Sequence, residues 1–163
     1  MCQWKNLPHF FFLYVIMVIA VDFDGTIVEH MYPKIGNEIP FATDTLKELI
    51  KDGHQLILWS VRENELLQEA VDWCSAKGVH FYKVNRYWDE NDEEEYSSST
   101  SGHHKYSRKI KADLFIDDRN IGGLPEWTAI YDIISKRISY EQYLREQVKE
   151  EKPAKPSFWS RFK

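Results

Sequence analysis

Two aspartates stand two positions apart where an apolar segment ends, in the order Asp22-Phe23-Asp24-Gly25-Thr26. Alternate side chains of a strand point to the same face, so Asp22 and Asp24 are expected to face one spot while Gly25 lets the chain turn away. One carboxylate could act as a nucleophile, and its neighbour could exchange protons with a reacting oxygen. The alternative is that Asp24 only orders the turn through Thr26 and nearby amides.

The apolar segments of the chain alternate with segments of helical periodicity. Helices are expected from an N-cap at Thr43 to a stop at Gly53, and from about residue 63 to residue 77 with Gly78 as the stop. The expected strands or strand-like segments are 17–23, 54–60, 79–84, 112–116 and 127–134. This alternation predicts an α/β fold, a doubly wound, Rossmann-like parallel sheet with helices on both faces and functional loops at the strands' carboxyl ends.

Composition limits the classes of function. The 163 residues suffice for one domain, and a net charge of −5 gives no general attraction to nucleic acid or to an anionic membrane. Cys2 and Cys74 are far apart and do not form a metal-binding pair, and Cys74 has the spacing of a buried helical residue. We therefore expect a cytoplasmic protein that does not bind nucleic acid.

The N-terminus contains Lys5 followed by the apolar run 10–21, a pattern similar to a secretory signal. A cut after Ala20 would remove the strand that must deliver Asp22, and the run is too short for a stable membrane span. We therefore interpret residues 1–16 as an N-terminal extension, residues 17–138 as the catalytic domain and residues 139–163 as a C-terminal helix and tail.

The Asp-Phe-Asp-Gly-Thr segment after an apolar strand resembles the first signature of the haloacid dehalogenase (HAD) superfamily. Ser60, at the end of Leu56-Ile57-Leu58-Trp59, is similar to the second signature. Lys109 matches the lysine of the third signature, and Asp117-Asp118, after Leu114-Phe115-Ile116, matches the acidic pair of the fourth. The resemblance covers roughly residues 17–135 and places all four signatures in the family's order.

This resemblance implies a magnesium-dependent phosphatase that works through an aspartyl-phosphate. It implies that Asp22 is the nucleophile, that Asp24 is the acid and base, and that Ser60 and Lys109 bind the phosphoryl group. The implied Mg²⁺ ligands are Asp22, Asp24 through its backbone carbonyl, Asp117 and Asp118. The chemistry is consistent, because an anionic ester repels a carboxylate until a cation and a lysine neutralise its oxygens, and hard oxygen ligands suit Mg²⁺.

Several assignments stay open at this stage. Lys105 and Lys111 lie close enough to Lys109 to compete with it for the role of phosphate-binding lysine. Arg62, two residues after Ser60, either reaches the substrate or forms a surface ion pair with a neighbouring glutamate.

Family members often carry a cap domain inserted after the first or third strand. Here the first insertion, 25–40, has the size of a small hairpin, and the second, 86–108, is a polar loop with many acidic residues. The chain therefore resembles the capless members, whose open sites accept exposed phosphates on larger molecules or are covered by another subunit of a homo-oligomer.

We therefore expect a Mg²⁺-dependent hydrolase of a phosphate monoester whose identity the sequence does not give. Two alternatives remain: a phosphotransferase or nucleotidase of the same superfamily, and a non-catalytic binding protein that keeps the HAD fold.

Overall fold

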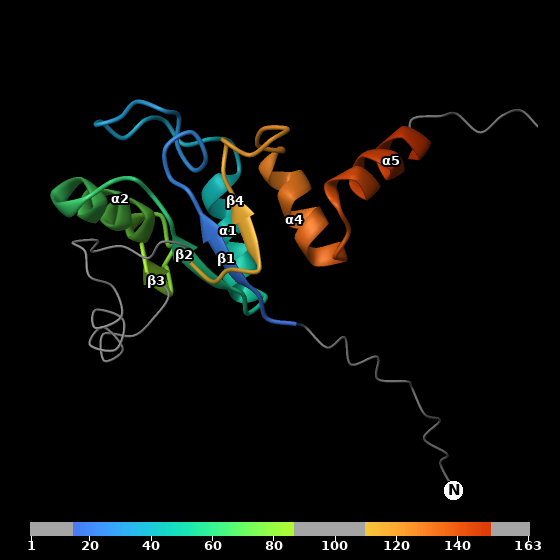
Figure 1. The fold of residues 1–163 in the computed structure, drawn as a ribbon, viewed down its shortest axis with the longest axis horizontal. Helices are drawn as coiled ribbons and strands as arrows, with labels where there is room; N and C mark the ends of the chain where they lie inside the picture. The colour runs from blue at the N-terminus through green and yellow to red at the C-terminus, as the bar shows by residue number, and fades with distance from the viewer. Residues whose placement is uncertain (1–14, 87–109, 151–163) are drawn as a thin grey trace, which may run out of the picture.

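The computed structural model describes residues 15–86 and 110–150 (Figure 1). Within these ranges strands and helices alternate as far as β3, and two helices follow the last strand. The elements are β1 (Val18–Val21), α1 (Ala42–Lys51), β2 (Gln55–Leu58), α2 (Asn64–Ala76), β3 (Lys83–Val84), β4 (Leu114–Ile116), α4 (Trp127–Lys136) and α5 (Tyr140–Glu150). No helix in these ranges is both long and apolar enough to cross a membrane.

The four strands form one parallel sheet in the order β3-β2-β1-β4. The central strand is β1, and its last residue, Val21, is in register with Leu58 of β2 and with Ile116 of β4. The carboxyl ends of these three strands are therefore level. Residues that follow them directly come to the same edge of the sheet, which is where doubly wound folds place their sites.

Alternate residues of the strands pack into separate clusters. Ile19 and Val21 of β1 belong to the main core, to which α1, α2 and α4 all contribute buried side chains. Ala20 points to the opposite face and joins Ile57 and Ile110 in a second cluster, in which no described helix takes part. The parallel sheet with its helices confirms the predicted α/β, Rossmann-like class.

One predicted strand is a helix. Residues 127–134 were expected to be strand-like because they are rich in aromatic and β-branched side chains, but they lie within α4. The buried residues Trp127, Ile130 and Ile134 follow helical rather than alternate spacing, and they pack on the main core. Packing of this stripe outweighs the β propensity of the segment.

The ends of the other elements differ in detail from the prediction. The first helix has its N-cap at Phe41, and Thr43 instead lies in the first turn, where its N–H and hydroxyl both donate to the Glu38 carboxylate. Gly53 and Gly78 follow α1 and α2 with φ of 91° and 83°, as expected of helix stops. The third strand is short, because only Lys83–Val84 of the predicted 79–84 pair with β2.

The insertion after β1 is a small hairpin, as predicted. Val28 forms an antiparallel bridge with Glu38, and the Ile39 N–H donates to the Ile27 carbonyl. No large cap domain is present in the described residues. Almost all of the second insertion, 86–108, lies outside them. The predicted C-terminal helix is α5, which lies beyond α4 and away from the sheet (Figure 1).

Candidate active site

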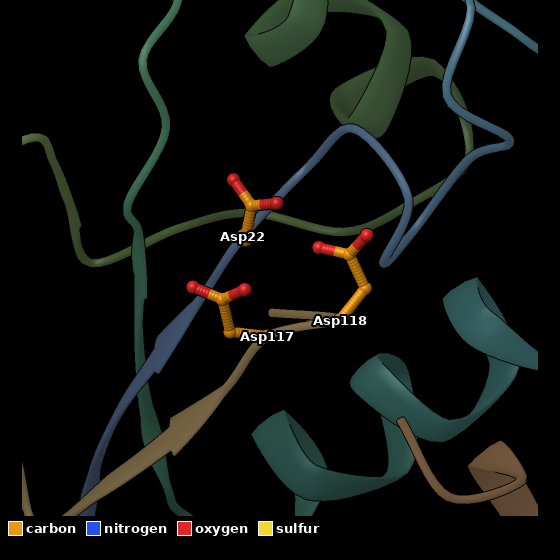
Figure 2. A group of neighbouring side chains, drawn as sticks. All are labelled: Asp22, Asp117 and Asp118. Carbon is orange, nitrogen blue, oxygen red and sulfur yellow. The ribbon is translucent and has the colours of Figure 1, made fainter. Parts of the chain in front are cut away.

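Three carboxylates meet at the level edge of the sheet. Asp22 follows β1, while Asp117 and Asp118 follow β4, and each offers an oxygen within 4.8 Å of those of the other two (Figure 2). Gly25 makes room for this approach, since a Cβ built on it would lie 2.3 Å from Asp118 Oδ2. The φ of Gly25 is also +90°, a conformation that other residues rarely adopt.

The electrostatics of this cluster are unfavourable in the absence of a cation. Burial is the largest cause that raises the pKa of Asp22, a hydrogen bond from the Phe23 backbone lowers it, and the nearby charges of Asp117, Asp118 and Asp24 raise it; together they bring the pKa to about 6. Oδ1 of Asp118 is buried and has no hydrogen-bond partner in the described part of the chain. A set of converging hard oxygens with an unsatisfied buried atom fits a divalent metal ion.

Thr26 holds the two sides of the cluster together. Its hydroxyl donates to Asp22 Oδ2 at 3.5 Å and accepts from the Asp118 N–H at 3.0 Å. Its carbonyl accepts from the Trp127 indole N–H at 3.0 Å, which fixes the turn to α4. The Thr26 hydroxyl therefore contacts Asp22 and Asp118, and these contacts do not include the Asp24 carboxylate, which in the alternative interpretation would order the turn through Thr26.

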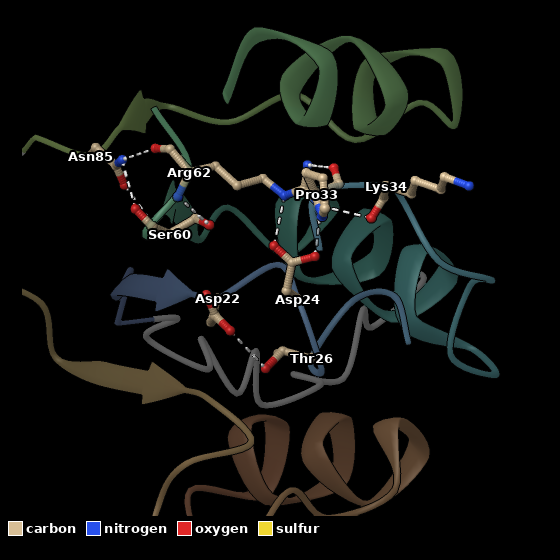
Figure 3. A network of polar contacts seen from close by, with 8 residues as sticks. All are labelled: Asp22, Asp24, Thr26, Pro33, Lys34, Ser60, Arg62 and Asn85. Atoms are coloured by element: carbon tan, nitrogen blue, oxygen red, sulfur yellow. Dashed lines mark hydrogen bonds and ion pairs between the residues drawn. The ribbon is translucent and has the colours of Figure 1, made fainter. Parts of the chain in front are cut away.

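The partner of Asp24 is Arg62. The Arg62 Nε donates to Asp24 Oδ2 at 2.6 Å, and Nη2 donates to Oδ1 at 2.7 Å (Figure 3). The Arg62 side chain has 0% exposure and that of Asp24 has 4%. Of the two alternatives for Arg62, the surface ion pair with a glutamate is wrong: the arginine is buried, and its carboxylate acceptor is Asp24.

The loop after β2 is held by Asn85, which follows β3. Asn85 Oδ1 accepts from the Ser60 N–H at 2.8 Å, and Nδ2 donates to the Ser60 carbonyl at 2.8 Å and to the Arg62 carbonyl at 3.3 Å (Figure 3). Asn85 is buried and has a positive φ of 49°, which asparagine tolerates better than most residues. Sequence reasoning missed Asn85, although its position directly after the third predicted strand was a usable signal.

A cavity of about 330 Å³ joins these groups. Five residues predicted for the site line it: Asp22, Asp24, Ser60, Arg62 and Asp117. Asp118 lies beside them in the carboxylate cluster. Lys109 and Lys105 lie outside the described residues, and Lys111 is exposed and does not line the cavity.

No protein-family model matches the chain. One solved structure, that of a conserved protein from Bacteroides thetaiotaomicron, is 55% identical and covers 77% of this chain and 95% of its own, with a TM-score of 0.66. The fold and site are thus those of a small α/β protein with an aspartate-lined pocket. The chain belongs to the same family as this conserved Bacteroides protein.

A second similarity is more distant. A Bacillus cereus protein described as "Putative nucleotidase" is 24% identical over 125 residues, which make up 74% of this chain and 59% of that protein. The chain thus spans less than two thirds of the length of this relative.

Proposed function

We propose that the chain is an HAD-type, Mg²⁺-dependent phosphatase that hydrolyses a phosphate monoester through an aspartyl-phosphate on Asp22. The observation that carries this proposal is the convergence of Asp22, Asp117 and Asp118, because Asp22 and Asp117 also line a cavity together with Ser60. The similarity to the Bacillus protein described as a nucleotidase supports the same class of reaction.

The residues present fit the metal. Asp22, Asp117 and Asp118 would hold Mg²⁺ together with the backbone carbonyl of Asp24, and such an ion would compensate the buried Asp118 carboxylate, whose Oδ1 has no hydrogen-bond partner among the described residues. Bound there, the ion supplies positive charge that offsets the repulsion between the anionic substrate and the carboxylate nucleophile.

The side chains then divide the reaction between them. A carboxylate oxygen of Asp22 attacks phosphorus, the bond from phosphorus to the ester oxygen breaks, and Asp24 gives a proton to the departing oxygen. In the second step Asp24 takes a proton from water, which attacks the phosphorus and returns Asp22 and inorganic phosphate. Asp24 can take part while bound to Arg62, because each carboxylate oxygen keeps a further lone pair.

Ser60 and Lys109 are proposed to bind the phosphoryl oxygens. Asn85 binds both the N–H and the carbonyl of Ser60, and among the described residues the Ser60 hydroxyl oxygen accepts one weak bond, from the Arg62 N–H at 3.3 Å. The hydroxyl hydrogen is therefore available to a phosphoryl oxygen in the cavity.

The proposal is tested by measuring phosphate release from a broad panel of phosphate esters with Mg²⁺ and with a chelator. Activity on the panel that requires Mg²⁺ supports the proposal, and faster turnover of nucleoside monophosphates than of sugar and aryl phosphates would favour the nucleotidase alternative. Transfer of labelled phosphate to an added alcohol instead of water would indicate a phosphotransferase. No Mg²⁺-stimulated activity on any ester would favour the binding protein.

Changing Asp117 to asparagine should raise the Mg²⁺ concentration needed for activity. We expect this Mg²⁺ concentration to rise by at least about 10–100-fold, because mutation of groups that only support a metal's ligands already lowers metal affinity or activity by this factor. The fold should be retained, because Asp117 lies at the edge of the sheet. The measurement is a Mg²⁺ titration of activity, with Asp44→Asn as the control, since Asp44 is an exposed aspartate on α1 that pairs with Lys47. A normal Mg²⁺ requirement in Asp117→Asn would remove this residue from the site.

Stabilisation by Mg²⁺ should depend on pH. The folded protein raises the pKa of Asp22 from 3.8 to about 6, so without metal this group favours folding at low pH and loses that contribution as the pH rises through 6. Mg²⁺ needs the ionised form and competes with the proton. We expect the rise in melting temperature on adding Mg²⁺ to be larger at pH 7.5 than at pH 5, by on the order of 5 °C. An equal rise at both values would show that the metal does not contact Asp22.

A further inference from the structure

Arg62 links three segments that surround the cavity. Besides its two bonds to Asp24, its Nη1 donates to the Pro33 carbonyl and its Nη2 to the Lys34 carbonyl, both at 3.0 Å (Figure 3). The carbonyl of Arg62 itself accepts from Asn85. One side chain thus joins the turn after β1, the hairpin insertion and the loop after β2.

The surroundings of the guanidinium leave it little freedom. It lies 5.1 Å from the centre of the Phe23 ring and 5.4 Å from that of Tyr32. The bidentate geometry to Asp24 uses the planar fork of arginine, which a lysine cannot reproduce. Both oxygens of the Asp24 carboxylate are therefore held in one orientation.

Stability alone is a weak reason for such a pair. Removing two charges from water costs about as much as their attraction returns, and apolar side chains of similar volume often stabilise a core as well. The pair also lies at the wall of the cavity, beside Asp22, where the position of a carboxylate matters for chemistry.

From these contacts we infer that Arg62 is a positioning residue, which acts through Asp24 and ties its orientation to the hairpin insertion at Pro33 and Lys34. The inference rests on the proposed function. Proton transfer requires Asp24 to lie within hydrogen-bond reach of the reacting oxygen, and a displacement of about 1 Å can cost on the order of 100-fold in rate. Four of the five N–H donors of Arg62 are bound to Asp24 and to backbone carbonyls, and its side chain is buried, so it is placed to act through Asp24 rather than on the substrate.

The test compares Arg62→Ala and Arg62→Lys with wild type on an alkyl phosphate. We expect kcat to fall about 100-fold in both variants while KM changes less than about threefold. Guanidinium ion at a non-denaturing concentration should raise the kcat of Arg62→Ala at least about tenfold. Methylammonium should not raise it, because only the planar fork of guanidinium bonds both oxygens of Asp24. Arg145→Ala is the matched control, since Arg145 is exposed on α5 and pairs with Glu141.

A double-mutant cycle separates action through Asp24 from an independent effect. The cycle uses an activated aryl phosphate for all four proteins, since the Asp24→Asn variant is expected still to turn this substrate over slowly. In the Asp24→Asn background, Arg62→Ala should lower this turnover by less than about threefold, because the carboxylate it positions is already gone. If the losses of turnover caused by Asp24→Asn and Arg62→Ala are additive, the inference is overturned. A kcat of Arg62→Lys equal to that of wild type would also overturn it, and this variant serves as the test if Arg62→Ala does not fold. A raised KM at normal kcat would instead show that Arg62 binds substrate. Wild type without activity on any phosphate ester refutes the proposed function, and this inference with it.

Discussion

Replacing Asp22 with asparagine is expected to abolish both turnover and the phosphoenzyme. An amide is a poor nucleophile, and the change also removes one of the three carboxylates proposed to hold Mg²⁺. Loss of a nucleophile lowers kcat by on the order of 10⁴–10⁶-fold in comparable cases. No other aspartate of the cluster follows the central strand β1, so we expect no substitute for Asp22 in the variant.

The same variant should remain folded, and this separates a chemical loss from a structural one. Asp22 is ionised at pH 7.5 in a place that raises its pKa to about 6, so its charge works against folding of the metal-free protein. Asp22→Asn removes that charge and should therefore be at least as stable as wild type in the presence of a chelator at this pH. Thermal unfolding measures the stability, and acid quenching with labelled substrate measures the phosphoenzyme. The control is Asp132→Asn, since Asp132 lies on α4, away from the carboxylate cluster, and pairs with Lys136. Labelled Asp22→Asn protein, or turnover by Asp22→Asn close to that of the control, would place the nucleophile elsewhere.

The convergence of the site could be predicted from the sequence because it follows from topology. Asp22, Ser60 and Asp117 each come just after a short apolar segment, and parallel strands bring their carboxyl ends to one edge. Val21 is in register with Leu58 and Ile116, so the three strands end at the same level and the residues that follow them lie close together.

The contacts that hold the site in shape could not be predicted in the same way. Arg62 and Asp24 are 38 positions apart, and their pairing depends on the course of the hairpin insertion, whose carbonyls complete the shell around the guanidinium. Asn85 acts through its side chain on a loop 25 positions earlier. Such long-range polar contacts have no period in the sequence, unlike strands and helices.

For helix α4 the local sequence pattern led to a wrong prediction. Aromatic and β-branched residues in 127–134 favour a strand in isolation, yet Trp127 donates to the Thr26 carbonyl and Thr45 donates to the Trp127 carbonyl. These contacts fix the start of α4 against the turn after β1 and against α1. Tertiary packing therefore decides the conformation of this segment.

Changing Asp24 to asparagine should leave the first chemical step intact for one class of substrate. An activated aryl phosphate has a leaving group that departs without a proton, so Asp22 can still be phosphorylated in this variant. Hydrolysis of the aspartyl-phosphate still needs a base for water and should stall. The expected result is a burst of about one phenolate per active site followed by slow turnover, with labelled phosphate held on Asp22. Alkyl phosphates should give no burst, because their leaving oxygen needs the proton.

Stability must be controlled in this experiment, because Asp24→Asn leaves the buried Arg62 without its charged acceptor. Breaking a buried ion pair from one side costs about 3–5 kcal/mol, so the variant should melt earlier than wild type and be assayed well below its melting temperature. A second variant, Asp24→Asn with Arg62→Met, removes both charges and should recover part of that stability while showing the same burst. If this double variant regains stability but not turnover, the loss of aspartyl-phosphate hydrolysis is due to the missing Asp24 carboxylate and not to instability. Full steady-state turnover of both aryl and alkyl phosphates by Asp24→Asn would show instead that Asp24 is not the acid and base, and the mechanism proposed for this site would be wrong even with its nucleophile correctly placed.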